Sequence, residues 1–324
     1  SVFILLFLFK IILFFKIFNK YLESNYLLAF FLLSPVFILF TIYDPNIFFI
    51  KDIFIKISIL LHAFIFIKKF NENNFKENNN FLKFLLLPVL IIVMLIHEYQ
   101  IFFIGFHILI SMGLCKNKNN VKSILKIYSF LLIPIFLLFI FMGNESQYQE
   151  INKILKEFNI SSVHPQLKGG LYSAIGGFYK WHFYYFTYNQ FVELFFSIIL
   201  GILIYYIFFQ TLLEKKIILF NSKYQKNIFL FIHPCLLIFI LAIDHGRNIS
   251  LISTNLIAYF STLSFSKVKF QQVISNINSS SSRKYAVYIF LFIYIFMWKL
   301  DQYAGYSMRE GPNTIFESSL FAEF

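Results

Sequence analysis

The chain has 324 residues, of which 59% are hydrophobic and 48 are phenylalanine, and its mean hydropathy is +0.71. This composition excludes a water-soluble globular domain of ordinary residue usage and indicates a polytopic membrane protein. The formal net charge is +12, but no soluble segment is large enough to carry a clustered basic face, so the charge does not indicate a nucleic-acid partner.

Apolar runs of near-spanning length, separated by polar clusters, predict about ten transmembrane helices. Several runs are shorter than the roughly 20 residues that cross a bilayer core, so their flanking Lys and Tyr side chains must reach into the interface. The predicted fold is an all-α transmembrane bundle that forms a single integral membrane domain over residues 1–324. The predicted helices are 2–15, 27–43, 53–67, 84–96, 101–115, 124–142, 190–211, 228–243, 249–265 and 285–300.

Lysine and arginine are distributed unevenly between alternate loops. One set of loops holds 18 basic and four acidic residues, whereas the opposite set together with the tail 301–324 holds seven basic and eleven acidic residues. The positive-inside rule assigns the first set to the cytoplasm, so both termini are expected to be extracytoplasmic and anionic lipid headgroups to be partners. The expected cytoplasmic loops are 16–26, 68–83, 116–126, 214–227 and 266–284.

Polar residues of varied type lie on the expected outer side, next to helix ends. The cytoplasmic stretches 68–83 and 275–284 are instead rich in Asn or Ser, and we expect them to be solvated linkers. We therefore expect any functional site to form on the outer face. The outer polar segments are 43–46, 97–100, 143–189, 244–248 and the tail 301–324.

His97 and Glu98 occupy a predicted turn of about four residues between two helices. A carboxylate pressed against apolar helices should have its ionised form disfavoured, and an adjacent imidazole gives it a proton partner. The pair is therefore an acid/base candidate, with the alternative that both residues only cap helix ends or pair with Arg247. We expect no metal and no cofactor here, because His107, nine residues after Glu98, lacks ligand spacing.

The long outer segment 143–189 divides into two parts. Its first part, SQYQEINKILKEFNI, places apolar residues at helical intervals and predicts an amphipathic helix on the membrane surface. Its second part contains two Gly pairs, which let backbone approach a substrate closely, and cations that suit phosphate. The alternative is a flexible connector with an interfacial aromatic belt at 178–188. The polar candidates of this part are His164, Lys168, Lys180, Trp181 and His182.

The segment 244–248, DHGRN, fills another short turn between predicted helices. Only three of the 28 basic residues are arginine, and two of them, Arg247 and Arg309, fall on the expected outer side. Arginine binds phosphate or carboxylate bidentately and stays charged, so we expect it where lysine would not serve. The alternative is an internal Asp244–Arg247 pair that only shapes the turn.

His62 and His107 lie inside predicted helices. A polar residue at such depth is a functional candidate, although an interhelical hydrogen bond is the commoner outcome.

About ten helices, a long outer loop in mid-chain and polar outer turns are similar to the bacterial surface-polysaccharide polymerases, namely the O-antigen polymerases and the EpsG-like exopolysaccharide proteins. The segments IHEYQIFF (96–103) and AIDHGRNIS (242–250) resemble the HE- and D-x-GR-containing hairpins of EpsG-like membrane proteins. The resemblance implies joining of lipid-pyrophosphate-linked oligosaccharides on the outer face of the bacterial plasma membrane. It also implies outer arginines that hold pyrophosphate, no metal, and polysaccharide-assembly proteins as partners.

A polyprenyl-pyrophosphate donor needs a hydrophobic groove for its tail, cations for its phosphates and a base for the acceptor hydroxyl. We expect Glu98 or His97 to supply the base, and Arg247 and Arg309 to supply the cations. The sugar ring is expected to stack on an aromatic side chain of segment 143–189. The remaining candidates are Asp244 for catalysis and His245, Lys168, His164, Asp44, and Trp181 or Tyr172 for substrate binding.

Three alternatives remain open at this point. A lipid-phosphosugar glycosyltransferase would use a catalytic Asp44 or Asp52. A lipid or polysaccharide transporter would need charge at mid-depth in the helices, which we do not expect, because Lys10, Lys56 and Lys299 fall within reach of a helix end or of water. A non-catalytic assembly subunit would tolerate single changes of the outer polar residues.

Overall fold

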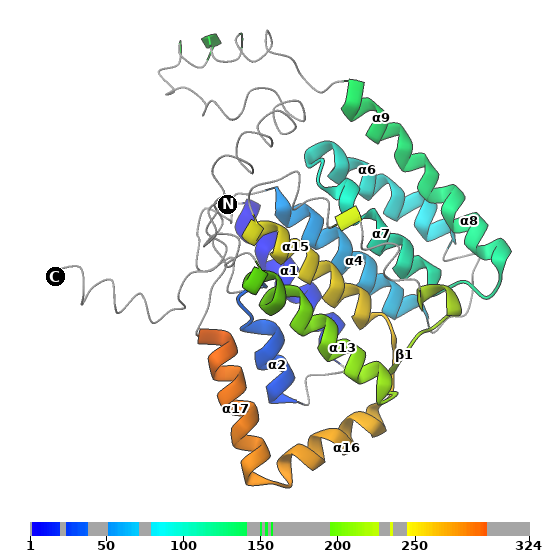
Figure 1. Ribbon diagram of the computed structural model, residues 1–324. Helices are drawn as coiled ribbons and strands as arrows, with labels where there is room; N and C mark the ends of the chain where they lie inside the picture. The colour runs from blue at the N-terminus through cyan, green and yellow to red at the C-terminus, as the bar shows by residue number, and fades with distance from the viewer. Residues whose placement is uncertain are drawn as a thin grey trace.

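The computed structural model of the chain is a helical bundle with one pair of short strands, drawn in Figure 1. The structure describes residues 2–19, 24–37, 51–70, 79–140, 150, 153–154, 157, 195–226, 234–235 and 245–296. The predicted all-α class is confirmed for this part of the chain. The predicted surface helix of segment 143–189 and the tail 301–324 lie almost entirely outside the described residues.

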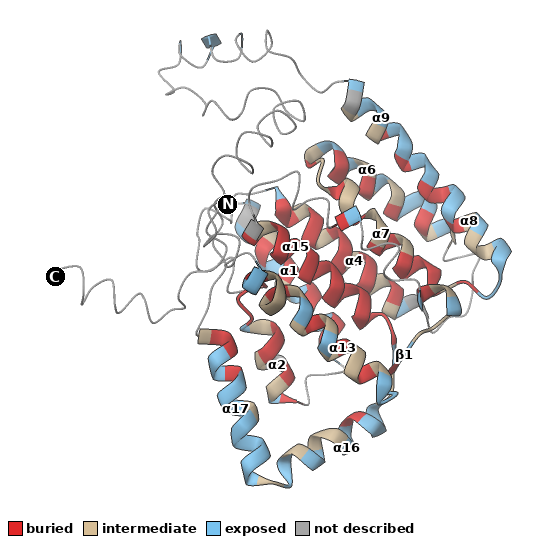
Figure 2. Cartoon of the chain, viewed as in Figure 1, coloured by how far each residue is buried: buried red, intermediate tan, exposed pale blue. Residues whose placement is uncertain are grey.

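Four helices form the centre of the bundle, and α15 is the most enclosed of them. Every residue from Asn248 to Leu263 is buried, and Figure 2 shows this helix in the buried colour beyond its first turn. Its polar side chains bond within the bundle: the Ser253 hydroxyl, for example, lies 2.6 Å from the carbonyl oxygen of Gly201. The central helices are α1 (Val2–Phe18), α4 (Asp52–Phe70), α7 (Gln100–Met112) and α15 (His245–Ser261).

Helices α4, α7 and α15 run in the same direction. Asp52, at the start of α4, contacts His97 just before α7 and Arg247 in the first turn of α15. Nearly three turns further along α4, His62 contacts His107 of α7. The π-helical segment η6 (Ile199–Leu203) and α13 (Ile204–Glu214) continue this parallel set beside α15, since Gly201 lies near Ser253 and the rings of Phe209 and Phe260 stack further along.

The opposite end of the bundle is closed by residues that follow α13 and α15. The strand β1 (Ile218–Leu219) pairs antiparallel with β2 (Ser264–Phe265), and the short helix η7 (Lys223–Lys226) follows β1. The Ser222 hydroxyl donates to the carbonyl oxygen of Met112 at 2.7 Å, which attaches this segment to the end of α7.

Helices α2 (Asn25–Leu32) and α17 (Ser281–Phe296) pack against each other beside the centre, and α16 (Lys267–Asn278) leads into α17. Two predictions need correction here. The predicted span 27–43 is interrupted, because α2 ends shortly before Pro35, which disfavours helix in the residue that precedes it. The predicted linker 275–284 is largely helical, although it is exposed to solvent as expected.

A second, smaller core lies on the other side of α7. The π-helical turn η3 (Leu82–Leu86) leads into α6 (Leu87–Ile96), which packs against α8 (Lys118–Tyr128), the short helix η4 (Ser129–Leu131) and α9 (Leu132–Ile140). Its buried side chains include Leu86, Leu90, Met94, Ile124 and Leu131.

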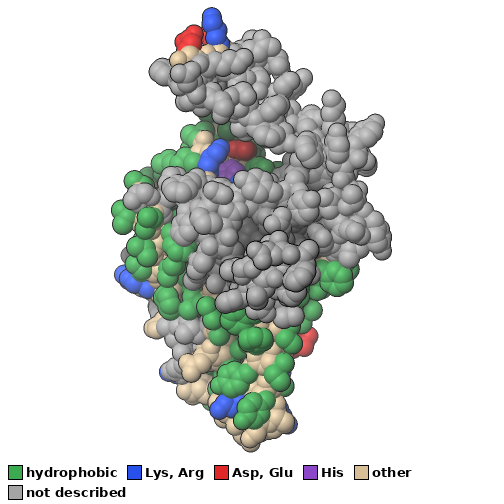
Figure 3. Space-filling model, turned by 90° about the vertical axis from the view of Figure 1, so that its left-hand side faces the viewer, with side chains coloured by type: hydrophobic (Ala, Val, Ile, Leu, Met, Phe, Trp, Pro, Cys, Tyr) green, Lys and Arg blue, Asp and Glu red, His purple; other side chains and the backbone are tan. Residues whose placement is uncertain are grey.

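Large apolar side chains cover much of the outside, as the green surface in Figure 3 shows. Three segments of the described chain are long and apolar enough to cross a membrane: Asn79–Ile96, Lys118–Leu138 and Phe195–Glu214. Only 28% of each apolar window is buried, so most of these side chains face outward. The described residues therefore support a helical protein with three candidate membrane-spanning segments, and they do not by themselves support about ten.

Candidate functional site

The candidate site lies where α4, α7 and α15 begin, and Asp52 is its centre. Asp52 is the first residue of α4, His97 follows the last residue of α6, and Arg247 lies in the first turn of α15. His97 has an extended backbone that ends α6, and the amide N–H of Gln100 donates to its carbonyl oxygen at 3.1 Å to start α7. The turn thus directs the imidazole toward Asp52.

Arg247 and His97 both bind the carboxylate of Asp52. The guanidinium donates from Nε to Oδ2 at 2.8 Å and from Nη2 to Oδ1 at 2.7 Å, which is the bidentate geometry of a strong ion pair. His97 Nε2 lies 2.7 Å from the same Oδ1. The side chains of Asp52 and His97 are each 4% exposed, and that of Arg247 is 15% exposed. We call Arg247, Asp52, His97 and Glu98 the charged chain.

The ionised form of Asp52 is favoured despite its burial. Burial alone would raise the pKa of this carboxyl group, but the charge and hydrogen bonds of Arg247, together with the hydrogen bond of His97, hold the pKa well below its usual range. The positive end of the α4 dipole also favours a carboxylate at this position. Asp52 is therefore an anchor for cations and a weak base.

His97 is shifted in the opposite direction. Burial would lower the pKa of its imidazole, but the hydrogen bonds and negative charges of Asp52 and Glu98 raise the pKa above its ordinary value. His97 therefore favours the imidazolium form. With Nε2 bound to Asp52, Nδ1 faces the carboxylate of Glu98 at 3.6 Å.

Glu98 forms the outer edge of the charged chain. Its Oε2 lies 3.6 Å from His97 Nδ1 and 4.0 Å from Lys51 Nζ, and its side chain is 36% exposed. The expectation that the apolar surroundings disfavour its ionised form is wrong. The interaction with His97 outweighs burial and lowers the pKa of Glu98 to about 2, so Glu98 is ionised and only a weak base at neutral pH.

Two lysines are buried further inside the bundle. Lys56 is 3% exposed and donates from Nζ to the Ser250 hydroxyl at 2.7 Å, one turn beyond the charged chain on both α4 and α15. Lys10 of α1 is 1% exposed, and its Nζ lies 4.7 Å from the ring centroid of Phe7. Both lysines are thus enclosed by packed helices rather than exposed to water, although Lys56 lies one turn from the start of α4, within reach of a helix end as expected.

His62 and His107 form a separate polar network. Their Nδ1 atoms are 3.1 Å apart, Ser111 Oγ lies 3.5 Å from His62 Nε2 and 2.9 Å from the Tyr128 hydroxyl, and Tyr128 donates to the carbonyl oxygen of His107 at 3.0 Å. The interhelical hydrogen bond anticipated for these histidines is present. The network links α4, α7 and α8.

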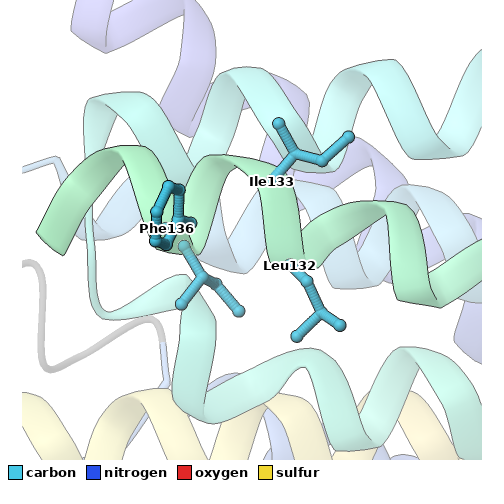
Figure 4. A pocket seen from close by; sticks show the side chains of 4 residues that line it. Leu132, Ile133 and Phe136 are labelled. Carbon is cyan, nitrogen blue, oxygen red and sulfur yellow. The ribbon is translucent and has the colours of Figure 1, made fainter. Parts of the chain in front are cut away.

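Apolar grooves lie on the other face of α7. One groove of about 350 Å³ is lined by α7, the α8–α9 segment and Pro234, and it begins at Ile101 and Ile104, one to two turns from His97. A shallower hollow on α9 is lined only by apolar side chains, of which Figure 4 labels Leu132, Ile133 and Phe136. Surfaces of this kind suit acyl or isoprenoid chains rather than polar ligands.

The structure thus brings together three predicted site residues, His97, Glu98 and Arg247. Arg247 pairs with Asp52, and the predicted alternative partner Asp244 lies outside the described residues. Of His245, only the backbone is described, as the first residue of α15. The other predicted site residues outside the described chain are Asp44, His164, Lys168, Tyr172, Trp181 and Arg309.

Asp52 is the candidate-site residue to which the sequence analysis gave too little weight. The sequence indicates Asp52 only as an alternative catalytic acid, yet its carboxylate binds both His97, 45 positions away, and Arg247, 195 positions away. The available signal was an acidic residue directly before a long apolar run, which is typical of a helix N-terminus. Within the described chain, no group of three or more His, Cys, Asp or Glu side chains is placed to hold a metal ion.

No protein-family model, curated protein or solved structure matches this chain.

Proposed function

We propose that the chain is a membrane-embedded transferase that transfers or polymerises lipid-pyrophosphate-linked oligosaccharides on the outer face of the bacterial plasma membrane. The observation that carries the proposal is the charged chain, in which a buried carboxylate holds an arginine and a histidine that the EpsG-like resemblance had singled out. Nδ1 of this histidine, His97, lies 3.6 Å from the carboxylate of Glu98, which is partly exposed.

We further propose ten crossings with both termini outside. Helices α4, α7, α13 and α15 correspond to the third, fifth, seventh and ninth predicted spans, and their shared direction is what an alternating topology requires. The charged chain and the basic loops 116–126 and 214–227 are at opposite ends of these helices. This separation supports an outer charged chain and an inner basic surface.

The electrostatics of this end favour an anionic substrate. Three helices, α4, α7 and α15, begin here, and each N-terminus carries a partial positive charge. Arg247 and Lys51 add full charges at the partly accessible edge. A pyrophosphate group fits this field, while its lipid tail has apolar surface available along α7 and α9.

In the proposed reaction, the acceptor hydroxyl attacks the anomeric carbon and the bond from that carbon to the pyrophosphate oxygen breaks. Glu98 is a weak base, so it receives the hydroxyl proton only as the new glycosidic bond forms and the attacking oxygen becomes acidic. The His97 imidazolium stabilises the negative charge of the departing pyrophosphate. Asp52 fixes the orientation of His97, and Arg247 fixes Asp52 through its bidentate contact.

A second candidate function, transport of an anionic lipid-linked glycan, is favoured by the buried Lys10 and Lys56. One experiment separates the two functions. The purified full chain is placed in vesicles with a polyprenyl-pyrophosphate-linked oligosaccharide, and both glycan length and the leaflet of the lipid are measured. Elongation supports the transferase, and translocation without elongation supports the transporter. The absence of both elongation and translocation would contradict both proposals.

A further inference from the structure

Gln100 carries a fully buried side-chain amide that makes no hydrogen bond to the described residues. It is the first residue of α7 and is 0% exposed. Among the described residues, neither its side-chain Oε1 nor its Nε2 has a hydrogen-bond partner. Only its backbone is engaged, through the N–H that donates to the carbonyl oxygen of His97.

An unsatisfied amide is costly at such a position. Leaving a buried polar group without a partner costs about 1–3 kcal/mol, whereas an apolar side chain of similar size would pack there without that cost. Neighbouring buried polar groups at this level do find partners: Lys56 bonds to Ser250, and Asp52 bonds to Arg247 and His97. Nδ1 of His97 also lacks a hydrogen-bond partner, but it lies 3.6 Å from the Glu98 carboxylate. Neither polar atom of the Gln100 amide is engaged, which is typical of a group that binds something else.

Helical periodicity places Gln100 beside the charged chain. Seven residues separate Gln100 from His107, which is close to two full turns, so both lie on the same face of α7. His107 contacts His62, so this face packs against α4. Gln100 lies two turns closer to the end where Asp52 binds His97.

The chemistry of an amide selects its ligand. Both oxygens of Asp52 are already occupied and Nδ1 of His97 faces Glu98, whereas the amide of Gln100 is left for a substrate at this end. An amide offers one acceptor oxygen and two N–H donors. A hydroxyl both donates and accepts, so it satisfies such a group, whereas an ionised phosphate oxygen cannot donate to the amide oxygen.

We propose that Gln100 binds a sugar hydroxyl of the lipid-linked glycan, next to the charged chain that faces its pyrophosphate. This inference rests on the proposed function and names the part of the substrate that this residue recognises. It assigns Gln100 a role in selecting sugar-bearing lipid over the bare lipid carrier.

The test compares two probes on the full chain in nanodiscs: polyprenyl pyrophosphate that carries a disaccharide, and the same lipid without sugar. The wild type should bind the sugar-bearing lipid about five- to tenfold more tightly, as expected for one or two neutral hydrogen bonds. Gln100→Leu and the similarly shaped Gln100→Met should lose this preference and bind the bare lipid as the wild type does. The exposed Gln272→Leu in α16 is the control and should keep the preference.

Thermal melting without ligand separates binding from structure. Because both apolar variants remove an unsatisfied amide, their ligand-free Tm should equal or exceed that of the wild type. A lower Tm with an unchanged sugar preference would show that Gln100 only holds a structural water, and would overturn the inference. Equal wild-type affinity for both lipids would overturn it while leaving the proposed function intact. Binding of neither lipid would overturn the proposed function as well.

Discussion

At the scale of single residues, the geometry of Arg247 matters more than its charge. Its Nε and Nη2 reach different oxygens of Asp52, and an ammonium group cannot reproduce this planar fork. The orientation of His97 depends on that fork, because Asp52 connects the two residues.

We predict that Arg247→Lys abolishes activity while the protein remains folded and inserted. Loss of the bidentate contact should cost about 2–4 kcal/mol in the transition state, which is a rate loss on the order of a hundredfold or more. The loss of activity is measured as glycan chain length in cells that carry each variant at equal abundance in the membrane. Arg283→Lys, at an exposed arginine of α17, is the matched control. Full-length polymer from Arg247→Lys would remove Arg247 from the proposed mechanism.

The shifted pKa of His97 predicts a pH dependence of stability. Its pKa in the folded protein is raised, so its contribution to stability is fully present below the ordinary value near 6.5 and is lost as pH rises through the folded pKa. The Tm of the wild type should therefore fall across that range, and His97→Gln should flatten the decline. Parallel Tm profiles for the two proteins would contradict the assigned protonation of His97.

At the scale of elements, η6 and α15 approach each other at a glycine. A Cβ at Gly201 would collide with the Ile249 side chain and lie 3.1 Å from Val36 Cγ1. We predict that Gly201→Ala lowers the Tm, at a cost of about 1–3 kcal/mol for overpacking. Ile249→Ala in the same chain should recover part of that loss by making room. An unchanged Tm in Gly201→Ala would show that the two helices are not packed this closely.

Element boundaries show what the sequence could predict. The apolar runs that became α4, α6 and α7 were recognised, because long hydrophobic stretches leave few alternatives to helix. The helix α16 was missed, since Asn- and Ser-rich composition resembles a linker and only Phe270 is fully buried. His97 and Arg247 were identified because polar residues between apolar helices stand out. Their shared partner was missed, because local patterns do not reveal a contact between distant segments.

At the scale of the whole molecule, charged and polar groups lie at the two ends of the parallel helices, and apolar surface lies between these ends. The charged chain lies at one end, and the segment 217–226, with the strand pair, lies at the other. Figure 3 shows hydrophobic side chains along the described surface between charged groups. This arrangement underlies the proposed orientation in a membrane.

We predict that a reporter fused after Lys118, Lys216 or Lys269 is cytoplasmic, and that one fused after Glu150 or Gly311 is external. The 18 to seven division of basic residues between the two sides is the reason. The side of the membrane is measured with paired fusions at each position, a phosphatase that is active outside and a fluorescent protein that fluoresces inside. If residue 150 were inside, the charged chain would face the cytoplasm and the outer-face reaction would be excluded.

The measurement that tests the central claim most directly is glycan elongation by purified Asp52→Asn in vesicles with a polyprenyl-pyrophosphate-linked oligosaccharide. The amide keeps the shape of Asp52 but removes the charge that holds Arg247 and His97. We predict at least a hundredfold loss of elongation. Glu214→Gln, which neutralises an exposed acid at the opposite end of α13, should retain wild-type rates. Elongation by a folded Asp52→Asn at the wild-type rate would contradict the account.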